Sequence, residues 1–259
     1  MSDQRPKDSS VWFVTGCSTG MGRQFALTLL SMGQKVIATA RNIDRIRDIE
    51  QAGAAVMTVD VTWSPERLKE VATSAIGTYG RVDYLINNAG YPCQGAIEEV
   101  SHQETYDIFS TNVFGVLNVT RSFLPHFRER RSGGIVIMSS ISSRQYFPGI
   151  TIYSATKAAV SMIGEGLKDE VEALGIKVLT VDLGVFKTSA FKRDTNLKKA
   201  AQVIPDYKPI NDRYDEIREI LMGNEPNDPK LGVLRIIEVI TQSGMAAGRV
   251  VPVRIPLGK

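Results

Sequence analysis

Tyr153 and Lys157 are the two residues of this 259-residue chain whose types and spacing most directly suggest chemistry. Residues four apart lie on the same face of a helix. A tyrosine ordinarily titrates at about pH 10, but a neighbouring ammonium group and a bound cationic ring both favour the phenolate and lower the pKa. Ser140 precedes Tyr153 by thirteen residues and closes a predicted strand. These side chains predict a proton-transfer site at the carboxyl edge of a parallel sheet, where open α/β sheets bind ligands.

A glycine-rich segment connects the first predicted strand to a helix rich in Ala and Leu. It reads Thr15-Gly-Cys-Ser-Thr-Gly-Met-Gly22. The first glycine permits a tight turn, the second lets backbone N–H groups approach a pyrophosphate, and the third allows the helix to pack closely on the strand. The alternative is a plain glycine-rich turn, which the strand-to-helix junction disfavours. The segment predicts a dinucleotide phosphate site formed by Gly16, Ser18, Thr19, Gly20, Met21 and Gly22.

Arg41 stands where the second predicted strand ends. A domain that binds NAD presents an acidic residue here to the ribose 2′-hydroxyl, but this chain has Ala40 followed by Arg41. A planar guanidinium suits a 2′-phosphate. We therefore expect NADP(H) to be favoured over NAD(H), although a solvated arginine that opens the next helix is the alternative.

The elements that position these residues follow an alternating pattern. Short β-branched runs alternate with longer helical periods, which is typical of an α/β fold with a parallel sheet covered on both faces. We predict a single Rossmann-type, doubly wound domain over residues 1–259, with right-handed crossovers and about seven strands. The strands are expected near Val11–Thr15, Lys35–Thr39, Ala55–Val59, Tyr84–Asn87, Gly134–Ser139, Lys177–Asp182 and Arg249–Pro252.

Helices should fill the gaps between the strands. Ser64 with Pro65, and Asp228 with Pro229, are start signals, because each pairs an N-cap side chain with proline at the first helical position. Two long helices are expected over Gln103–Arg131 and Thr151–Leu174. In residues 187–228, prolines, glycines and charges interrupt any long period, so we expect a loop that covers the substrate as a lid.

Taken together, these motifs resemble the short-chain dehydrogenase/reductase family. The resemblance extends from Val11 to the last strand, and it rests on the glycine segment, Asp60-Val61, Asn87-Asn88-Ala89-Gly90, Asn112, Ser140 and Tyr153-x-x-x-Lys157. Gly16-Cys-Ser18, the run Val36 to Arg41 and the closing Arg254-Ile-Pro-Leu-Gly258 are similar to the branch of retinol and hydroxysteroid dehydrogenases. A chance pairing of Tyr153 and Lys157 on a helix surface is disfavoured by the other motifs.

The resemblance implies a role for each residue. Tyr153 would exchange a proton with the substrate oxygen while hydride passes between nicotinamide and carbon, Ser140 would hydrogen-bond that oxygen, and Lys157 would lower the tyrosine pKa and bind the nicotinamide ribose. Asn112 would anchor a proton-relay water. The implied cofactor contacts are Asp60, Val61, Asn88, Ala89, Gly90, Tyr153, Lys157, Val185 and Thr188, although Asp60 could instead be a turn residue.

One departure from the family pattern follows the sixth strand. The family usually has Pro-Gly, but Leu183 precedes Gly184 here. Leucine restores a backbone N–H and frees φ. We expect a more mobile loop beside the nicotinamide, with Val185 and Thr188 still contacting the carboxamide.

The substrate pocket is expected to form from Tyr91–Glu99, Ile141–Ile152 and the lid. Its apolar members should be Tyr91, Ile141, Tyr146, Phe147, Phe186 and Phe191. This lining favours a bulky, largely apolar ketone or secondary alcohol. Four basic residues could recognise an anionic tail, but a solvated helical face is the favoured explanation: Lys192, Arg193, Lys198 and Lys199.

Composition excludes several other classes of protein. A net charge of +3 is far below what a nucleic-acid surface needs, and the apolar runs are shorter than the ~20 residues that a bilayer requires. We expect a cytoplasmic protein without a targeting signal. Cys17 and Cys93 should be reduced, and His102 and His126 are too isolated to form a metal centre.

The expected activity is the reduction of a bulky ketone by NADP(H), with Tyr153 as the acid. Oxidation of an alcohol is the alternative, because the same residues serve both directions. A non-catalytic NADP-sensing module is a second alternative, but it would gain nothing from Asn112, Ser140, Tyr153 and Lys157 together. The resemblance also implies a homodimer or homotetramer that packs through the two long helices.

Overall fold

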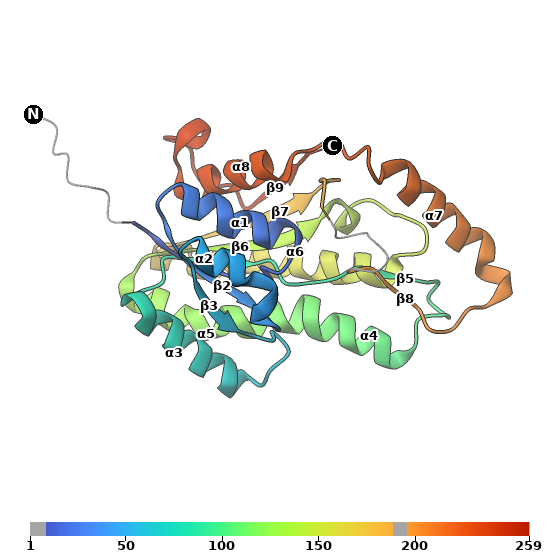
Figure 1. Ribbon diagram of the computed structural model, residues 1–259, viewed down its shortest axis with the longest axis horizontal. Helices are drawn as coiled ribbons and strands as arrows, with labels where there is room; N and C mark the ends of the chain where they lie inside the picture. The colour runs from blue at the N-terminus through green and yellow to red at the C-terminus, as the bar shows by residue number, and fades with distance from the viewer. Residues whose placement is uncertain (1–8, 189–195, 259) are drawn as a thin grey trace, which may run out of the picture.

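A seven-stranded parallel sheet lies at the centre of the protein (Figure 1). The computed structural model describes residues 9–188 and 196–258. The strand order is β3-β2-β1-β4-β6-β7-β9, and every neighbouring pair is parallel. The strands are β1 (Val11–Val14), β2 (Lys35–Ala40), β3 (Ala55–Thr58), β4 (Tyr84–Asn87), β6 (Gly133–Ser140), β7 (Ile176–Leu183) and β9 (Arg254–Leu257). The predicted Rossmann-type fold is confirmed.

The last strand does not lie where the sequence placed it. Arg249–Pro252 was expected as a strand, but it is irregular. β9 begins at Arg254, after the end of the expected strand. Val250 has 81% of its surface exposed, so its β-branched side chain is not part of the sheet. Backbone pairing with β7 starts at Val253, whose carbonyl accepts a hydrogen bond from the Thr180 N–H.

Helices cover both faces of the sheet, because successive strand side chains point to opposite sides. Trp12 and Val14 pack into one core with α1 (Gly20–Ser31), α2 (Arg47–Gln51) and α8 (Pro229–Thr241). Val11 and Phe13 pack into a second core with α3 (Pro65–Tyr79), α5 (Gly115–Arg130) and α6 (Thr151–Val171). In Figure 1, α1 and α8 lie above the sheet, and α3 and α5 lie below it.

The two predicted helix starts are confirmed. The Ser64 hydroxyl accepts a hydrogen bond from the Arg67 N–H at 3.4 Å at the start of α3, and Asp228 accepts one from the Lys230 N–H at 2.8 Å at the start of α8. Pro65 and Pro229 occupy the first helical positions. Each cap satisfies a backbone donor that the helix itself leaves without a partner.

The helix expected over Gln103–Arg131 is interrupted. It consists of α4 (His102–Phe109), one π-helical turn over Ser110–Phe114, and α5. A π turn inserts an extra residue and often marks a functional site. The second long helix agrees with its expected range, because α6 is followed by a 3₁₀ turn over Glu172–Leu174.

The expected loop over 187–228 contains regular structure. α7 (Lys208–Leu221) lies within it, and β8 (Lys198–Lys199) pairs in parallel with β5 (Cys93–Gln94). Apolar residues recur through α7 at helical spacing, but the charges between them and Pro209 hide the period in the sequence. The buried Glu99 carboxylate anchors this segment by accepting hydrogen bonds from the Ile204 N–H and the Asn211 amide.

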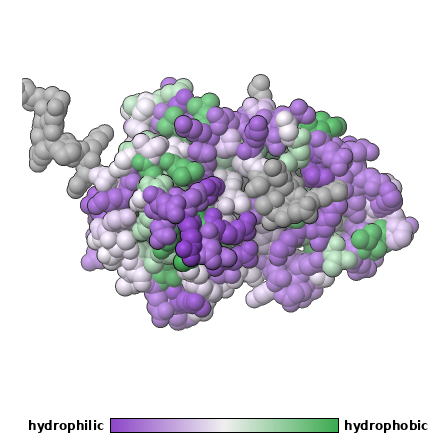
Figure 2. Space-filling model, viewed as in Figure 1, coloured by the Kyte–Doolittle hydropathy of each residue, from purple (hydrophilic) through white to green (hydrophobic). Residues whose placement is uncertain are grey.

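The surface is mostly hydrophilic on the face shown in Figure 2, where hydrophobic side chains form small separate patches. No helix within the described ranges is long and apolar enough to cross a membrane. The described residues also contain no cluster of His, Cys, Asp or Glu that could hold a metal ion. Cys17 and Cys93 are buried free thiols, and burial raises the pKa of Cys17 to about 12.

Candidate active site

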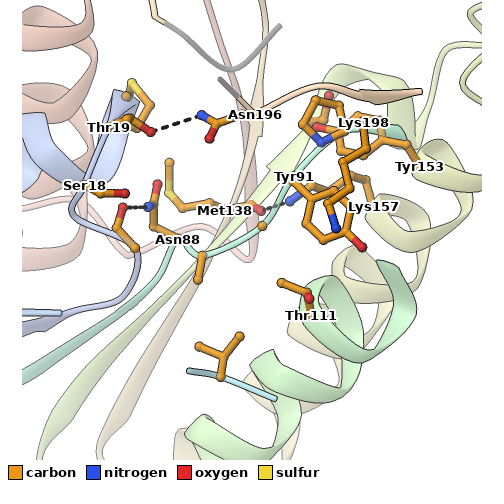
Figure 3. A pocket seen from close by; sticks show the side chains of 18 of the residues that line it. Ser18, Thr19, Asn88, Tyr91, Thr111, Met138, Tyr153, Lys157, Asn196 and Lys198 are labelled. Atoms are coloured by element: carbon orange, nitrogen blue, oxygen red, sulfur yellow. Dashed lines mark hydrogen bonds between the residues drawn. The ribbon is translucent and has the colours of Figure 1, made fainter. Parts of the chain in front are cut away.

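A cavity of about 640 Å³ opens at the carboxyl edge of the sheet (Figure 3). In the close-up, Ser18, Thr19 and Asn88 lie on one side of it, and Tyr91, Tyr153 and Lys157 lie on the other. The predicted site residues that line it are Gly16, Ser18, Thr19, Gly20, Met21, Arg41, Asp60, Val61, Asn88, Ala89, Gly90, Ser140, Tyr153, Lys157 and Thr188. Three predicted residues do not line it: Gly22, Asn112 and Val185.

The glycine segment leaves the start of α1 open toward this cavity. Gly16 and Gly20 have φ of +71° and +58°, values that favour glycine. Thr19 is the N-cap residue, but its side chain makes no capping hydrogen bond, and the first turn of α1 has no acidic residue. The free N–H groups and the positive end of the helix dipole therefore suit an anion such as a pyrophosphate.

Gly22 does not line the cavity, but it packs against two residues that do, Gly16 and Asn88. A Cβ at this position would lie 2.3 Å from Nδ2 of Asn88 and 2.4 Å from the carbonyl oxygen of Gly16. The Asn88 amide donates hydrogen bonds to the carbonyls of Thr15 and Gly16 at 2.9 and 3.2 Å. Because Gly22 has no side chain, Asn88 can connect the segment after β4 to the glycine turn.

Arg41 and Asp60 lie in the part of the cavity beyond β2 and β3. The Arg41 side chain is exposed, whereas Ala40 is buried with 4% of its surface accessible. Asp60 uses one carboxylate oxygen to accept hydrogen bonds from the N–H and hydroxyl of Thr62, at 3.0 and 2.8 Å. Asp60 is therefore both a turn residue and part of the cavity wall.

Tyr153 and Lys157 project from one face of α6, and both are buried. The Lys157 Nζ donates a hydrogen bond of 2.9 Å to the Met138 carbonyl and lies 5.8 Å from the centre of the Tyr153 ring. Burial lowers the pKa of Lys157 to about 8. Burial also raises the pKa of Tyr153 to about 12, and a hydrogen bond with Ser140 only partly opposes this rise. The sequence suggested that Lys157 lowers the pKa of Tyr153. In the structure, burial has the larger effect, and the pKa of Tyr153 is raised.

Ser140 closes β6 and begins the next turn. Its hydroxyl oxygen accepts hydrogen bonds from the N–H and the hydroxyl of Ser142, at 3.2 and 3.0 Å. Ser143 donates a hydrogen bond of 2.6 Å to the Ser140 carbonyl. Two neighbouring serines therefore fix the position of the predicted catalytic serine.

Asn112 lies in the π turn and is 1% exposed. Its amide donates hydrogen bonds to the Tyr91 carbonyl and the Thr156 hydroxyl at 3.0 and 3.1 Å, and its oxygen accepts one from the Tyr91 N–H at 3.1 Å. Thr156 donates in turn to the Tyr153 carbonyl at 2.7 Å. Asn112 thus braces the helix that carries Tyr153, and both of its amide donors are used within the protein.

Comparison with known proteins agrees with this arrangement. Residues 10–199 match the profile of the short chain dehydrogenase family. The chain belongs to the short-chain dehydrogenase/reductase family. It is 35% identical over 223 residues to a 3-ketodihydrosphingosine reductase of Bacteroides thetaiotaomicron, a match that covers 85% of this chain and 79% of that protein.

Two solved structures of the same family are also similar. A short-chain dehydrogenase from Streptomyces avermitilis has a TM-score of 0.85 and 37% identity, with 98% of this chain and 90% of that chain covered. An actinorhodin polyketide ketoreductase with NADPH has a TM-score of 0.76 and 28% identity, with 96% and 95% covered. The retinol and hydroxysteroid branch remains a prediction.

This short-chain dehydrogenase has a second, apolar cavity of about 70 Å³. Ser140, Tyr153 and Thr188 line both cavities, together with Leu183, Gly184 and Phe186. The remaining walls of the apolar cavity come from the segment between β6 and α6, from Val185, and from α7 and the residues that follow it. The two spaces therefore meet at the predicted catalytic hydroxyls.

The predicted substrate residues are only partly brought together. Ile141, Phe147 and Phe186 line the apolar cavity, and Tyr91 lines the larger one. Tyr146 lines neither cavity, and 70% of its surface is exposed. Phe191, Lys192 and Arg193 lie outside the described residues.

Lys198 and Lys199 belong to β8, so the helical face suggested for them is wrong. The strand places Lys198 against the larger cavity, where its Nζ lies 4.4 Å from the centre of the Tyr91 ring.

Leu183 ends β7 as a regular strand residue, paired with Ser140 on one side and Leu257 on the other. Its side chain lines both cavities. Val185 lines only the apolar cavity, and its carbonyl accepts a hydrogen bond of 2.6 Å from the Asn227 amide. The greater loop mobility expected from the loss of proline remains a prediction.

Sequence reasoning missed several residues that build the site. Ser142 and Thr156 lie within predicted segments, but only their contacts reveal their roles. Thr15 had a local signal, since it directly precedes the glycine turn, and its hydroxyl accepts from the N–H groups of Asn88 and Ala89. Asn196 had none, and its amide donates a hydrogen bond of 3.0 Å to the Thr19 hydroxyl (Figure 3).

Proposed function

We propose that this short-chain dehydrogenase reduces a bulky, largely apolar ketone to a secondary alcohol with NADPH. The observation that carries the proposal is the position of Tyr153 and Ser140, which line both the dinucleotide-sized cavity and the apolar one. A carbonyl held in the apolar cavity would meet these hydroxyls where the two spaces join. Oxidation of an alcohol with NADP⁺ is the alternative direction.

The larger cavity fits a nicotinamide dinucleotide. The uncapped N-terminus of α1 would hold the pyrophosphate, and Tyr153 and Lys157 line the opposite side. When bound, the nicotinamide supplies the hydride that is added to the carbonyl carbon. Val185 and Thr188 are the proposed carboxamide contacts, although Val185 borders only the apolar space.

Tyr153 would act as the general acid. Because burial raises its pKa to about 12, the phenol keeps its proton at neutral pH and can give it to the substrate oxygen as the hydride adds to carbon. Ser140 would donate a hydrogen bond to the same oxygen and stabilise its developing negative charge. The Lys157 ammonium would stabilise the phenolate that forms, and a water held near Asn112 would return a proton from solvent.

Arg41 would select NADP(H) over NAD(H). The guanidinium is exposed and lines the cavity, beyond β2, where it could pair with a 2′-phosphate in bidentate fashion. The similar polyketide ketoreductase was solved with NADPH. Both observations support the preference for NADP(H).

The name of one relative supports the substrate class. The 3-ketodihydrosphingosine reductase is named for a ketone on a long apolar chain, which agrees with a cavity lined by Ile141, Phe147, Ile150, Ile217 and Leu221. A non-catalytic NADP-sensing role is disfavoured, because it would not need Ser140 and Tyr153 at the junction of the two cavities.

The test is ketone-dependent oxidation of NADPH. A panel of aryl and long-chain ketones, with the matching alcohols and NADP⁺, would be assayed with the wild type, Tyr153→Phe and Tyr146→Phe. We expect Tyr153→Phe to lower kcat about a hundred- to ten-thousandfold, which is the usual contribution of general acid catalysis. Tyr146 is exposed, so its variant should match the wild type. Full activity of Tyr153→Phe, or turnover confined to small polar sugars, would refute the proposal.

We also propose that the protein is a cytoplasmic homodimer or homotetramer. Phe114, in the π turn before α5, has 46% of its surface exposed, and Met162, in α6, has 68% exposed. A second copy of the chain could cover both side chains. Analytical ultracentrifugation of the wild type and of Met162→Glu would test the assembly, and cell fractionation would test the location.

A further inference from the structure

α7 places two polar side chains in the wall of the apolar cavity. Tyr214 and Arg218 are four residues apart, so they lie on one face of the helix, and both line the cavity with Ser140 and Tyr153. Tyr214 is 5% exposed, and the Arg218 side chain is 11% exposed. A phenol and a guanidinium are unusual in a space otherwise walled largely by aliphatic and aromatic groups, because buried polar groups are costly without partners.

The Arg218 guanidinium is incompletely satisfied by the protein. Its buried Nε–H has no hydrogen-bond acceptor within the described part of the chain. Among the described residues, the guanidinium pairs with two carboxylates: Asp215 lies 3.5 Å from Nε and Glu219 lies 3.3 Å from Nη2, and the Glu219 side chain is 67% exposed. Asp215 also accepts hydrogen bonds from Gln94 at 3.2 Å and from Lys199 at 3.1 Å. Its charge is therefore shared with a second cation.

Tyr214 shares the cavity wall with Arg218 and with the proposed catalytic tyrosine, Tyr153. The pKa of Tyr214 is raised mainly by burial, and charge at Tyr153 adds to the rise while Arg218 opposes it. Both groups thus act on the same phenol. The described residues provide no hydrogen-bond partner for the Tyr214 hydroxyl, so this donor is available to a ligand.

We propose that Tyr214 and Arg218 form a subsite for a carboxylate of the substrate, at a distance from the carbonyl that is reduced. This proposal rests on the proposed function and narrows its substrate class to keto acids with an apolar body. The guanidinium would form a charge-assisted hydrogen bond with the carboxylate, and the phenol would donate a second one. Glu225 is the acidic residue among the described residues of the cavity wall, and it should oppose the same ligand.

The experiment compares benzoylpropionate with its methyl ester, which share one ketone and one apolar body. We expect the wild type to favour the acid, measured as the ratio of kcat/KM values with NADPH. Arg218→Met should lower this ratio at least about tenfold, because the acid loses an ionic contact that the ester does not make. Arg218→Lys should retain part of the preference, and Tyr214→Phe should lower the ratio severalfold. Glu225→Gln should change the ratio in the opposite direction and favour the acid further.

An equal ratio in the wild type and Arg218→Met, or an equal loss for acid and ester, would overturn the subsite. If the wild type reduces neither compound, the proposed function is in doubt, and binding tests the subsite separately. In that case benzoylpropionate should raise the Tm of the wild type with NADPH bound and have no such effect on Arg218→Met. An equal shift for both proteins would refute the subsite.

Discussion

Ser142 donates two hydrogen bonds to the hydroxyl oxygen of Ser140, from its N–H at 3.2 Å and from its own hydroxyl at 3.0 Å. A serine oxygen has two lone pairs, so both are occupied. The Ser140 proton must then be donated to another group, and Tyr153 is a hydrogen-bond partner of Ser140 in the same cavity wall. We therefore infer that Ser142 positions Ser140, whose proposed role is to donate a hydrogen bond to the substrate oxygen.

Replacing Ser142 by alanine should lower kcat about two- to tenfold, the effect of losing one neutral hydrogen bond. The KM for the ketone should change little, and Ser142→Thr should restore most of the rate. Ser154→Ala is the matched control, because the Ser154 hydroxyl is buried without a hydrogen-bond partner among the described residues. An equal loss in kcat for both alanine variants would contradict the role of Ser142.

Arg41→Ala should lower kcat/KM for NADPH at least about tenfold, because a charge-assisted hydrogen bond is lost. The value for NADH should stay constant. Arg45→Ala is the control, since Arg45 is an exposed arginine nearby that does not line the cavity. If the NADPH/NADH ratio is the same in Arg41→Ala and the wild type, Arg41 does not select the cofactor.

Lys157 should impose a pH limit on cofactor use. Its pKa is lowered to about 8 by burial, so the ammonium form is present below this pH and is lost as pH rises through it. We expect kcat/KM for NADPH to fall above about pH 8, because this ratio reports the free enzyme. Lys157→Arg keeps its charge, so its profile should stay flat through this range. A wild-type profile that is also flat would contradict the assignment.

Lys157 should also make stability depend on pH, but here stability should rise with pH, whereas cofactor use should fall. Its ordinary pKa of 10.5 applies to the unfolded chain, whereas the folded value is about 8. Between these values the unfolded state binds more protons, so the contribution of Lys157 to the free energy of unfolding rises with pH. Urea unfolding between about pH 7.5 and 9.5 covers part of the interval between the two pKa values. The free energy of unfolding should rise less with pH in Lys157→Met than in the wild type, or not rise at all.

Gly22→Ala should weaken cofactor binding and stability together. The added Cβ would meet the Asn88 amide at 2.3 Å and the Gly16 carbonyl at 2.4 Å, so the turn that faces the pyrophosphate must shift. We expect a loss of about 1–3 kcal/mol in unfolding free energy, which is typical of overpacking, and a Kd for NADPH at least about tenfold higher. Gly77→Ala is the control, because a Cβ there has open space and alanine favours the helix. A normal Kd in Gly22→Ala would show that the turn tolerates the clash.

Asp182 should be a major stabilising residue behind the site. Its carboxylate is fully buried and pairs with Arg254 at 2.7 Å and Arg144 at 2.8 Å. Arg254 also donates to Ser143, which holds the Ser140 carbonyl. Removing one partner of a buried pair costs about 3–5 kcal/mol, so Asp182→Asn and Arg254→Met should each lower the unfolding free energy by roughly this amount.

Arg144 provides the comparison within this network. Its side chain is 55% exposed, and exposed ion pairs contribute about 0–1 kcal/mol. Arg144→Met should therefore cost much less than Arg254→Met in urea unfolding. Equal losses for the two arginines would show that burial does not govern this network.

The local sequence was sufficient to predict the sheet and the glycine turn, and most of the predicted site residues line one cavity. Strand and helix periods are properties of short segments, and Ser64-Pro65 or Gly16 to Gly22 act through neighbouring residues. The last strand was placed too early, because Val250 and Val251 resemble strand residues whether or not a neighbouring strand pairs with them. α7 was missed because its apolar period is mixed with charges and becomes clear only when one face is seen to be buried.

The amino-acid sequence by itself determined the fold class and the side chains that we propose for proton transfer, because motif spacing and periodicity are encoded locally. Only the tertiary structure decided how these groups are tuned. Burial raises the pKa of Tyr153 against the expectation from Lys157, and Ser142 orients Ser140. The tertiary structure also placed Tyr214 and Arg218 in one cavity wall with Ser140 and Tyr153, the proposed catalytic hydroxyls. Desolvation and long-range contacts depend on which distant segments pack together, and spacing along the chain does not specify them.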